Sequence, residues 1–147
     1  MAGAVRDAEQ SVSHADRSGD AFLRMGIRTT YADALHQAGR WAEAEARFRE
    51  AEEMQAERQP DYPLLYSLQG FRYCDLLLTE AERGAWRVIC PRPPEDRDAH
   101  RATLQAVSER AAQTLHWATD PFTNASLPDV ALDHLTLGRA ALYAAIL

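Results

Sequence analysis

The chain has 147 residues, a formal net charge of −6, and 16 basic residues that are all arginine. This length suits one domain with a buried core. The absence of lysine excludes a lysine Schiff base, a lysine general base and a Walker-type phosphate-binding lysine. The arginines are scattered among carboxylates, so the chain lacks the basic face that nucleic acid binding requires.

The composition favours helices. Alanine (27 residues) and leucine (16) far outnumber valine (5) and isoleucine (3), which argues against a sheet-based fold. No apolar run reaches the roughly 20 residues that span a bilayer, and the N-terminus lacks a signal peptide core. We therefore expect a cytoplasmic all-α protein without membrane contact. Cys74 and Cys90 are interpreted as reduced thiols, with a disulfide as the alternative.

Glycine and capping residues divide the first half of the chain. Gly19 and Gly39 are typical of helix C-termini, because glycine tolerates the left-handed conformation there. Asp20 is a natural N-cap, and Pro60 ends the helical pattern before it. These signals predict three helices, at about 2–17, 21–38 and 41–58.

The second half predicts three more helices. One begins at 61–63 and reaches at least Leu78, after which 79–89 either continues the helix or breaks near Gly84. Pro91, Pro93 and Pro94 predict a proline-rich loop insertion at 90–95. Ser126 and Asp129 fit a capping box. The remaining helices are expected at about 95–118 and 127–147, which makes six main helices.

Two patterns alternate along these helices. One set carries an alanine, an apolar residue four positions later and an alanine three beyond, a spacing that keeps all three on one helix face. The intervening helices carry a small residue among apolar ones. The first set comprises Ala8, Val12 and Ala15, then Ala44, Phe48 and Ala51, then Ala111, Leu115 and Ala118; the second is centred on Ala32, Gly70 and Gly138.

The central unit, Trp41-x-x-Ala44-x-x-x-Phe48-x-x-Ala51 after Ala32 and Gly39, resembles the tetratricopeptide repeat. The likeness covers about 34 residues, from Met25 to Arg58, and Leu137-Gly138 supplies the Leu-Gly pair of that motif. The resemblance implies antiparallel helical hairpins stacked as a right-handed solenoid over 1–147. It also implies a concave groove that binds a protein or peptide partner.

By this resemblance, the first helix of each hairpin lines the groove. The residues that lie off its packing face are the partner-binding candidates, and the alternative is an ordinary hydrated surface. The candidates are Thr29, Asp33, His36 and Gln37, then Ser67, Phe71 and Asp75, then Arg139 and Tyr143.

Catalytic and metal motifs are missing from the sequence. The five histidines are far apart, and the only carboxylate-x-x-His is Asp33-x-x-His36, whereas di-iron bundles need repeated pairs of this kind. Cys74 lies in an apolar run and is interpreted as a buried hydrophobic residue. We therefore predict no catalytic residue, no metal site and no cofactor.

The favoured function is a non-enzymatic protein-interaction scaffold. One alternative is the sensor or oligomerisation arm of a larger bacterial signalling NTPase, by fold-level analogy. Another is a small all-α hydrolase or metal enzyme that uses histidine and cysteine.

The last helix, 127–147, is apolar around most of its circumference, and Arg139 is the only charge in its final eleven residues. Terminal repeats normally present a polar outer face. We therefore expect a missing helix or another subunit to cover this end. The chain would then be an excised segment of a longer protein, or a homo-oligomer that pairs through this helix.

Overall fold

The computed structural model describes residues 2–89, 97–121 and 126–147, and within these ranges it contains six α-helices and no strand. The all-α prediction is therefore confirmed. The proline-rich loop predicted at 90–95 and Cys90 lie outside the described residues. The chain divides into two compact units, Met1–Leu65 and Tyr66–Leu147, which are described separately below.

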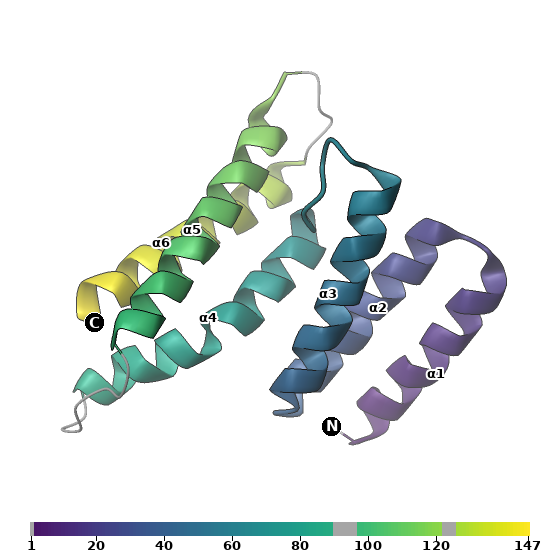
Figure 1. Cartoon of the computed structure of the whole chain (residues 1–147), viewed down its shortest axis with the longest axis horizontal. Helices are drawn as coiled ribbons and strands as arrows, with labels where there is room; N and C mark the ends of the chain where they lie inside the picture. Colours follow the sequence, from purple (N-terminus) through teal and green to yellow (C-terminus); the bar gives the residue numbers. More distant parts are fainter. Residues whose placement is uncertain (1, 90–96, 122–125) are drawn as a thin grey trace. The chain divides into compact units, whose positions relative to one another are not determined.

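Unit 1 contains three helices joined by short turns. The middle helix packs against both of its neighbours, and successive helices run antiparallel (Figure 1). The observed bounds lie within one residue of the predicted ones. The helices are α1 (Ala2–Ser18), α2 (Ala21–Gln37) and α3 (Trp41–Arg58).

The turns of unit 1 confirm the predicted capping. Gly19 and Gly39 have φ angles of 72° and 77°, in the left-handed region that favours glycine. The backbone N–H of Leu23 donates to the Asp20 carboxylate at 3.0 Å, so Asp20 is the N-cap of α2. The sequence therefore encodes these boundaries locally.

The core of unit 1 contains the alanine–phenylalanine pattern of α3. Ala44, Phe48 and Ala51 are fully buried, and so are Ala32 and Leu35 on α2. Small residues on both sides of the Phe48 ring allow α2 to approach α3 closely. The repeat-like residues of the central unit therefore pack the α2–α3 hairpin.

A buried arginine joins the three helices of unit 1. The Arg28 guanidinium on α2 lies 2.8 Å from the Asp16 carboxylate of α1 and 2.8 Å from the Glu50 carboxylate of α3. The hydrogen bond to Asp16 raises the pKa of Arg28 above its ordinary value, and Glu50 contributes further. Arg28 therefore positions α1 and α3 on the two sides of α2.

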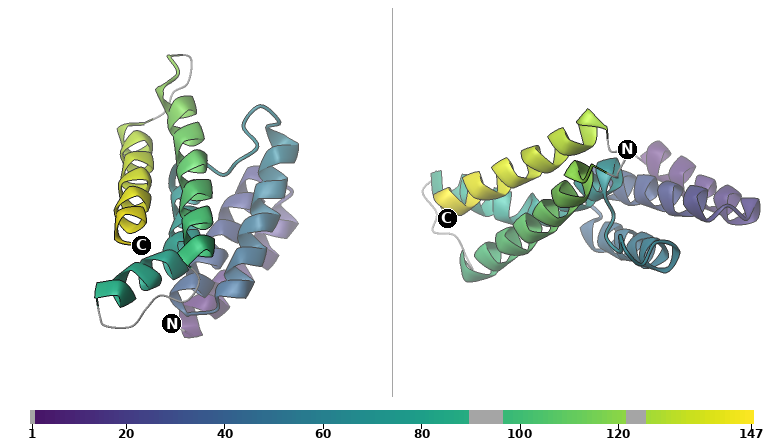
Figure 2. Two further views of the ribbon diagram at one scale, coloured as in Figure 1. Left: turned by 60° about the vertical axis from the view of Figure 1, so that its left-hand side comes forward. Right: turned by 90° about the horizontal axis from the view of Figure 1, so that it is seen from above.

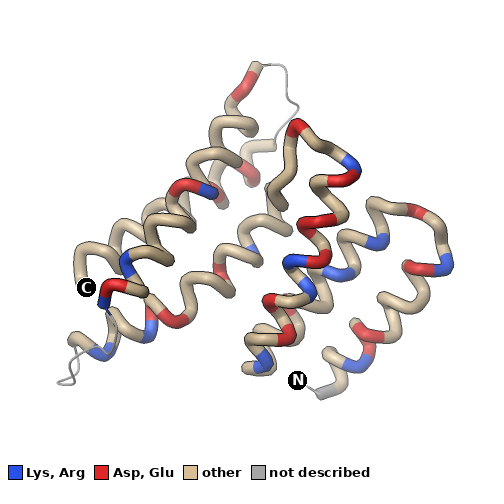
Figure 3. The backbone as a smooth tube through the Cα atoms, viewed as in Figure 1, with Lys and Arg blue, Asp and Glu red and all other residues tan. Residues whose placement is uncertain are grey.

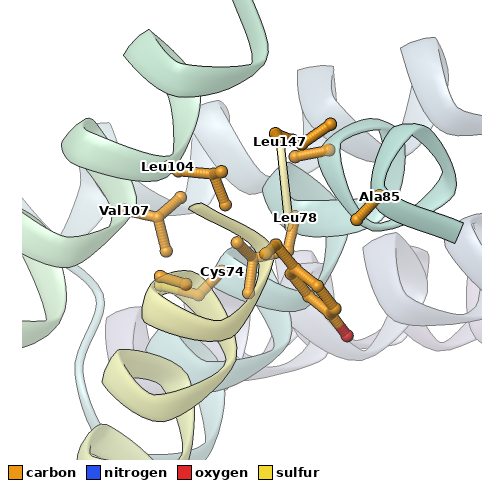
Figure 4. Close-up of a cluster of buried hydrophobic side chains, with 9 residues drawn as sticks. Cys74, Leu78, Ala85, Leu104, Val107 and Leu147 are labelled. Atoms are coloured by element: carbon orange, nitrogen blue, oxygen red, sulfur yellow. The ribbon is translucent and has the colours of Figure 1, made fainter. Parts of the chain in front are cut away.

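Unit 2 is a three-helix bundle in which each helix packs against the other two. The α5 and α6 helices lie side by side (Figure 2). Figure 4 shows the buried cluster between the helices, which includes Cys74 and Leu78 from α4, Leu104 and Val107 from α5, and Leu147 at the chain end. The helices are α4 (Ser67–Ile89), α5 (Arg97–Thr119) and α6 (Leu127–Ile146).

The α4 helix starts later than predicted. It begins at Ser67 rather than at 61–63. Two α3 side chains explain the difference, because they bind the backbone of the preceding segment in a non-helical path. The Gln55 amide donates to the Tyr62 carbonyl at 2.9 Å, and the Leu65 N–H donates to the Glu52 carboxylate at 2.8 Å. These side chain–backbone bonds replace the first helical turn.

Gly84 does not break α4, which continues to Ile89. A Cβ atom at Gly84 would lie 2.8 Å from the His100 ring of α5. The glycine therefore allows close contact between α4 and α5 within a continuous helix. At the start of α6, the Ser126 N–H donates to Asp129 at 2.9 Å, which confirms the predicted capping box.

Candidate partner-binding surface

The four groove candidates on α2 occupy different environments in unit 1. Thr29 is buried, and its hydroxyl donates to the Gly26 carbonyl at 2.8 Å. Asp33 and His36 are half-buried, and Gln37 is exposed. Thr29 is therefore a core residue rather than a surface residue, and the accessible part of this set is Asp33, His36 and Gln37.

The structure brings two predicted groove residues of unit 2 into direct contact. The Arg139 guanidinium of α6 donates to the Asp75 carboxylate of α4 at 2.7 Å, and to the Glu82 carboxylate at 3.1 Å. Burial lowers the pKa of Arg139, but the hydrogen bonds to these carboxylates outweigh burial and raise it. Asp75 and Arg139 therefore hold α4 and α6 together.

Two of the remaining candidates of unit 2, Ser67 and Tyr143, also serve the contact between α4 and α6. Tyr143 is buried, burial raises the pKa of its hydroxyl, and this hydroxyl interacts with Arg139 and Glu82. Phe71 is half-buried. The Ser67 hydroxyl at the start of α4 donates to the Asp129 carboxylate at the start of α6. These contacts join the same two helices.

The sequence reasoning did not single out an exposed apolar stripe on α6. Leu127, Leu135 and Leu142 are 86%, 51% and 54% exposed. Gly138 lies between the last two, with open space where its Cβ would be. Spacings of three, four and seven residues place these positions along one helix face. We call this stripe the α6 outer face, which consists of Leu127, Ala131, His134, Leu135, Gly138, Ala141, Leu142 and Ala145, all exposed.

The charged residues of α6 are directed away from this face. Asp133 is buried, and its carboxylate accepts a hydrogen bond from the Thr114 hydroxyl of α5 at 2.8 Å. Asp129 binds Ser126 and Ser67, and Arg139 binds α4. His134 is therefore the only ionisable residue of the α6 outer face.

The signal for this face was present in the sequence. An amphipathic surface helix alternates an apolar stripe with a polar one, whereas the last helix is apolar on both sides. The predicted outcome was that something covers this end. The pairing of Arg139 with two α4 carboxylates identifies which face of the helix is uncharged. Helical spacing alone does not reveal this pairing.

Two features bear on metal and nucleophile chemistry in the described residues. No group of three or more histidine, cysteine, aspartate or glutamate side chains there is arranged to hold a metal ion. Cys74 is a free cysteine, and burial raises the pKa of its thiol to about 12. This thiol is a poor nucleophile at neutral pH.

Comparisons with known proteins leave the chain without an assigned family. No family model, curated protein or solved structure matches it. Among the described residues, no helix is long and apolar enough to cross a membrane.

Proposed function

We propose that this protein is a non-enzymatic protein–protein interaction module, and that the α6 outer face is its recognition surface. The observation that carries this proposal is the row formed by Leu127, Leu135 and Leu142, each more than half exposed. Covering apolar surface contributes roughly 25 cal/mol for each Å². A row of exposed leucines with no charged neighbour on the same face is typical of interaction sites.

The spacing of the leucines suits a helical partner. Leu135 and Leu142 are seven residues apart, which corresponds to two helical turns. Partners that recognise a helix contact anchors at such spacings and leave the intervening positions to small residues. Gly138 and Ala141 lie between the two leucines, so a second helix can approach the α6 backbone closely.

A tetratricopeptide-like arrangement forms part of this proposal. It is supported in unit 1 by the antiparallel α2–α3 hairpin, in which Ala44, Phe48 and Ala51 are fully buried. In that arrangement, Asp33 and Gln37 on α2 give unit 1 a polar surface of its own for a partner. Charge reversal at Asp33 tests that surface. Reversal at Asp75 does not, because it breaks the ion pair with Arg139 inside unit 2.

Photo-crosslinking from defined positions tests the proposal. A benzoylphenylalanine is placed at Leu142 on the α6 outer face, and the matched control carries it at exposed Ala46 on α3. We expect a discrete protein adduct from position 142 that position 46 does not give. The adduct partner is then purified and titrated, and Leu135→Glu should weaken its binding at least tenfold, because the charge must be desolvated in the contact.

Equal labelling from both positions, or no adduct from position 142, would show that the α6 outer face is not a recognition surface. If Leu135→Glu leaves the affinity of the crosslinked partner unchanged, position 142 lies at the edge of some other contact.

A further inference from the structure

We propose that the partner recognised at α6 is a basic helical segment of another protein, whose arginine or lysine side chain binds to Glu82 and Trp86 of α4. This inference rests on the proposed function and specifies the chemistry of the partner. Three observations favour it: the line of contact between α4 and α6, the charge along that line, and an exposed tryptophan at its end.

The α4 and α6 helices pack side by side and run in the same direction. The contacts that fix their alignment are Ser67 with Asp129, Asp75 with Arg139, and Glu82 with Arg139. These pairs are 62, 64 and 57 positions apart, and the nearly constant separation shows the shared direction. We call the line formed by these residues the α4–α6 seam. Leu135 and Leu142 lie four positions before and three positions after Arg139, so the α6 outer face borders the seam.

The middle of the seam carries more negative than positive charge. The carboxylates of Asp75 and Glu82 share the one guanidinium of Arg139, and the Glu82 side chain is 33% exposed. Burial alone would raise the pKa of Glu82. Interactions with Tyr143, Arg139 and Trp86 outweigh burial and lower this pKa, so Glu82 is a carboxylate at neutral pH. The net charge of −6 on the whole chain also attracts a basic partner at long range.

The excess negative charge lies at the Glu82 end of the seam. Arg72 is one turn before Asp75 on α4 and supplies positive charge near the start of the seam. Arg83 directly follows Glu82 and therefore lies about 100° around the helix from it. Arg139 is divided between two carboxylates. A basic side chain of a partner is therefore attracted most strongly to Glu82.

Trp86 adds an aromatic surface next to this carboxylate. It lies four residues after Glu82, one turn further along α4, and is 56% exposed. Arginine and lysine bind over the face of an indole ring through their positive charge, and tryptophan is the best aromatic residue for this contact. A neutral side chain gains neither this attraction nor the ion pair with Glu82. The two side chains together therefore favour a guanidinium or ammonium group.

A helical segment over the seam contacts two helices rather than one. The α6 helix has 20 residues, which gives a length of about 30 Å. Two helices, each about 10 Å wide, therefore offer roughly 600 Å². Leu135 and Leu142 border this strip, and Trp86 lies at its end. The area approaches the roughly 800 Å² for each partner that is typical of specific complexes, so we expect a dissociation constant on the order of 10 μM.

Selection from a random library tests which chemistry the seam prefers. The probe is a phage-displayed library of peptides of about 16 residues, long enough to cover roughly 24 Å as a helix. The library is selected on the full chain and, in parallel, on Leu142→Ser, which removes the apolar contact without adding charge. We expect peptides that require Leu142 to carry arginine or lysine at a fixed position beside their apolar residues, at least about threefold more often than unselected peptides. Peptides that require Leu142 but show no basic position would overturn the inference.

Titration of a selected peptide locates its charge on the protein. The basic residue is replaced by citrulline or acetyllysine, which remove the charge but keep most of the shape, and binding is measured by fluorescence anisotropy. We expect this replacement to weaken binding to the wild type about tenfold, and binding to Glu82→Gln less than about twofold. The matched control is Glu109→Gln at an exposed carboxylate of α5, which should behave like the wild type. Equal losses for all three proteins would show that the charge acts at long range and that the assignment to Glu82 is wrong.

A second variant leaves the ion pairs of Arg139 in place. Trp86→Ala should keep the wild-type melting temperature, because the indole is more than half exposed. It should weaken the basic peptide about fivefold and the neutral peptide much less, because only the basic side chain gains from the charge of the ring face. Equal weakening of both peptides would overturn the placement of the basic side chain at Trp86.

The results separate this inference from the function on which it rests. If peptides or the protein crosslinked at position 142 require Leu142 but bind without a basic residue, the interaction function stands and the inference about charge fails. If no peptide requires Leu142 and position 142 gives no adduct, both proposals fail.

Discussion

The outer faces of α3 and α6 distribute charge in opposite ways. On α3, carboxylates and guanidinium groups pair along the helix surface, and red and blue segments are mixed along this helix in Figure 3. Examples are Arg40 with Glu43 at 2.5 Å at the start of the helix and Arg49 with Glu45 at 2.5 Å. On α6, the charged side chains pair with neighbouring helices, and the exposed positions are leucine, alanine and glycine apart from Pro128 and His134.

Under the proposed function, this difference separates a helix surface adapted to water from one adapted to a partner. Exposed ion pairs contribute little to stability but keep a helix face hydrated. Inward ion pairs fix the geometry of a bundle and leave its outer face apolar. We therefore expect substitutions on the inner faces of both helices to change the free energy of unfolding. Substitutions on the outer face of α3 should change neither stability nor binding, and those on the α6 outer face should change binding.

The largest effect is expected on the inner face of α3. Phe48→Ala removes a fully buried ring from between α2 and α3 and should lower the free energy of unfolding by about 3–5 kcal/mol. Urea denaturation measures this change. The exposed neighbour Arg49 is the control, and Arg49→Ala should leave the midpoint nearly unchanged. Similar losses for both variants would show that α3 lacks the inner and outer faces described above.

The fold of unit 1 was largely predictable because its signals are local. Gly19, Asp20 and Gly39 act within one turn of the chain, and Ala44 and Phe48 are buried as the helical spacing required. The start of α4 was not predictable in the same way. It depends on Gln55 and Glu52 reaching the backbone of a later segment, which no sequence window reveals.

The candidate site was less predictable than the fold. Asp75 and Arg139 are 64 positions apart, and their pairing depends on how α4 and α6 pack. Sequence reasoning placed both in a groove, because the tetratricopeptide resemblance implies that residues off the packing face of the first helix of each hairpin line it. The bundle instead joins them, and this pairing is what leaves the α6 outer face without charge.

A second prediction compares an inward arginine with an outward one. Arg139→Ala leaves the Asp75 and Glu82 carboxylates without their guanidinium partner in a partly buried site and should lower the free energy of unfolding by about 2 kcal/mol. Arg40→Ala at the exposed start of α3 is the control and should not change the melting temperature measurably. If the two variants have the same melting temperature, the α4–α6 ion pairs contribute no more to stability than exposed ion pairs do.

A third prediction concerns pH and a buried carboxyl of α6. Burial raises the pKa of Asp133 above its usual 3.8, although the Thr114 hydrogen bond opposes the shift. Because the folded state then holds the proton more tightly, the group favours folding below pH 3.8, and this contribution is lost as pH rises through the raised value. Asp133→Asn stays neutral and should raise the melting temperature at pH 7 by about 2 °C.

The advantage of Asp133→Asn should disappear at pH 3, where the aspartic acid is protonated as well. Asp129→Asn is the matched control with the opposite sign. Burial alone would raise the pKa of Asp129, but hydrogen bonds from Ser67 and Ser126 outweigh burial and lower the pKa below its usual 3.8. Its contribution to stability is therefore present above pH 3.8 and lost as the pH falls. That variant should melt lower at pH 7. A loss of stability at pH 7 in Asp133→Asn would show that its carboxylate is needed as a charge.

The smallest effect on stability is expected on the α6 outer face, and its size decides what the face is for. Leu135→Glu, measured at low concentration, should keep the melting temperature within about 2 °C of the wild type, because the leucine is about half exposed and packs little of the bundle. Ala140→Glu, on the inner face of the same helix, should unfold unit 2, because it places a charge in the core. Equal destabilisation by both would mean that the exposed leucines belong to the folding core. A Leu135→Glu protein that is stable but no longer binds its partner would show that the exposed leucines of α6 serve binding. The charged outer face of α3, by contrast, serves hydration.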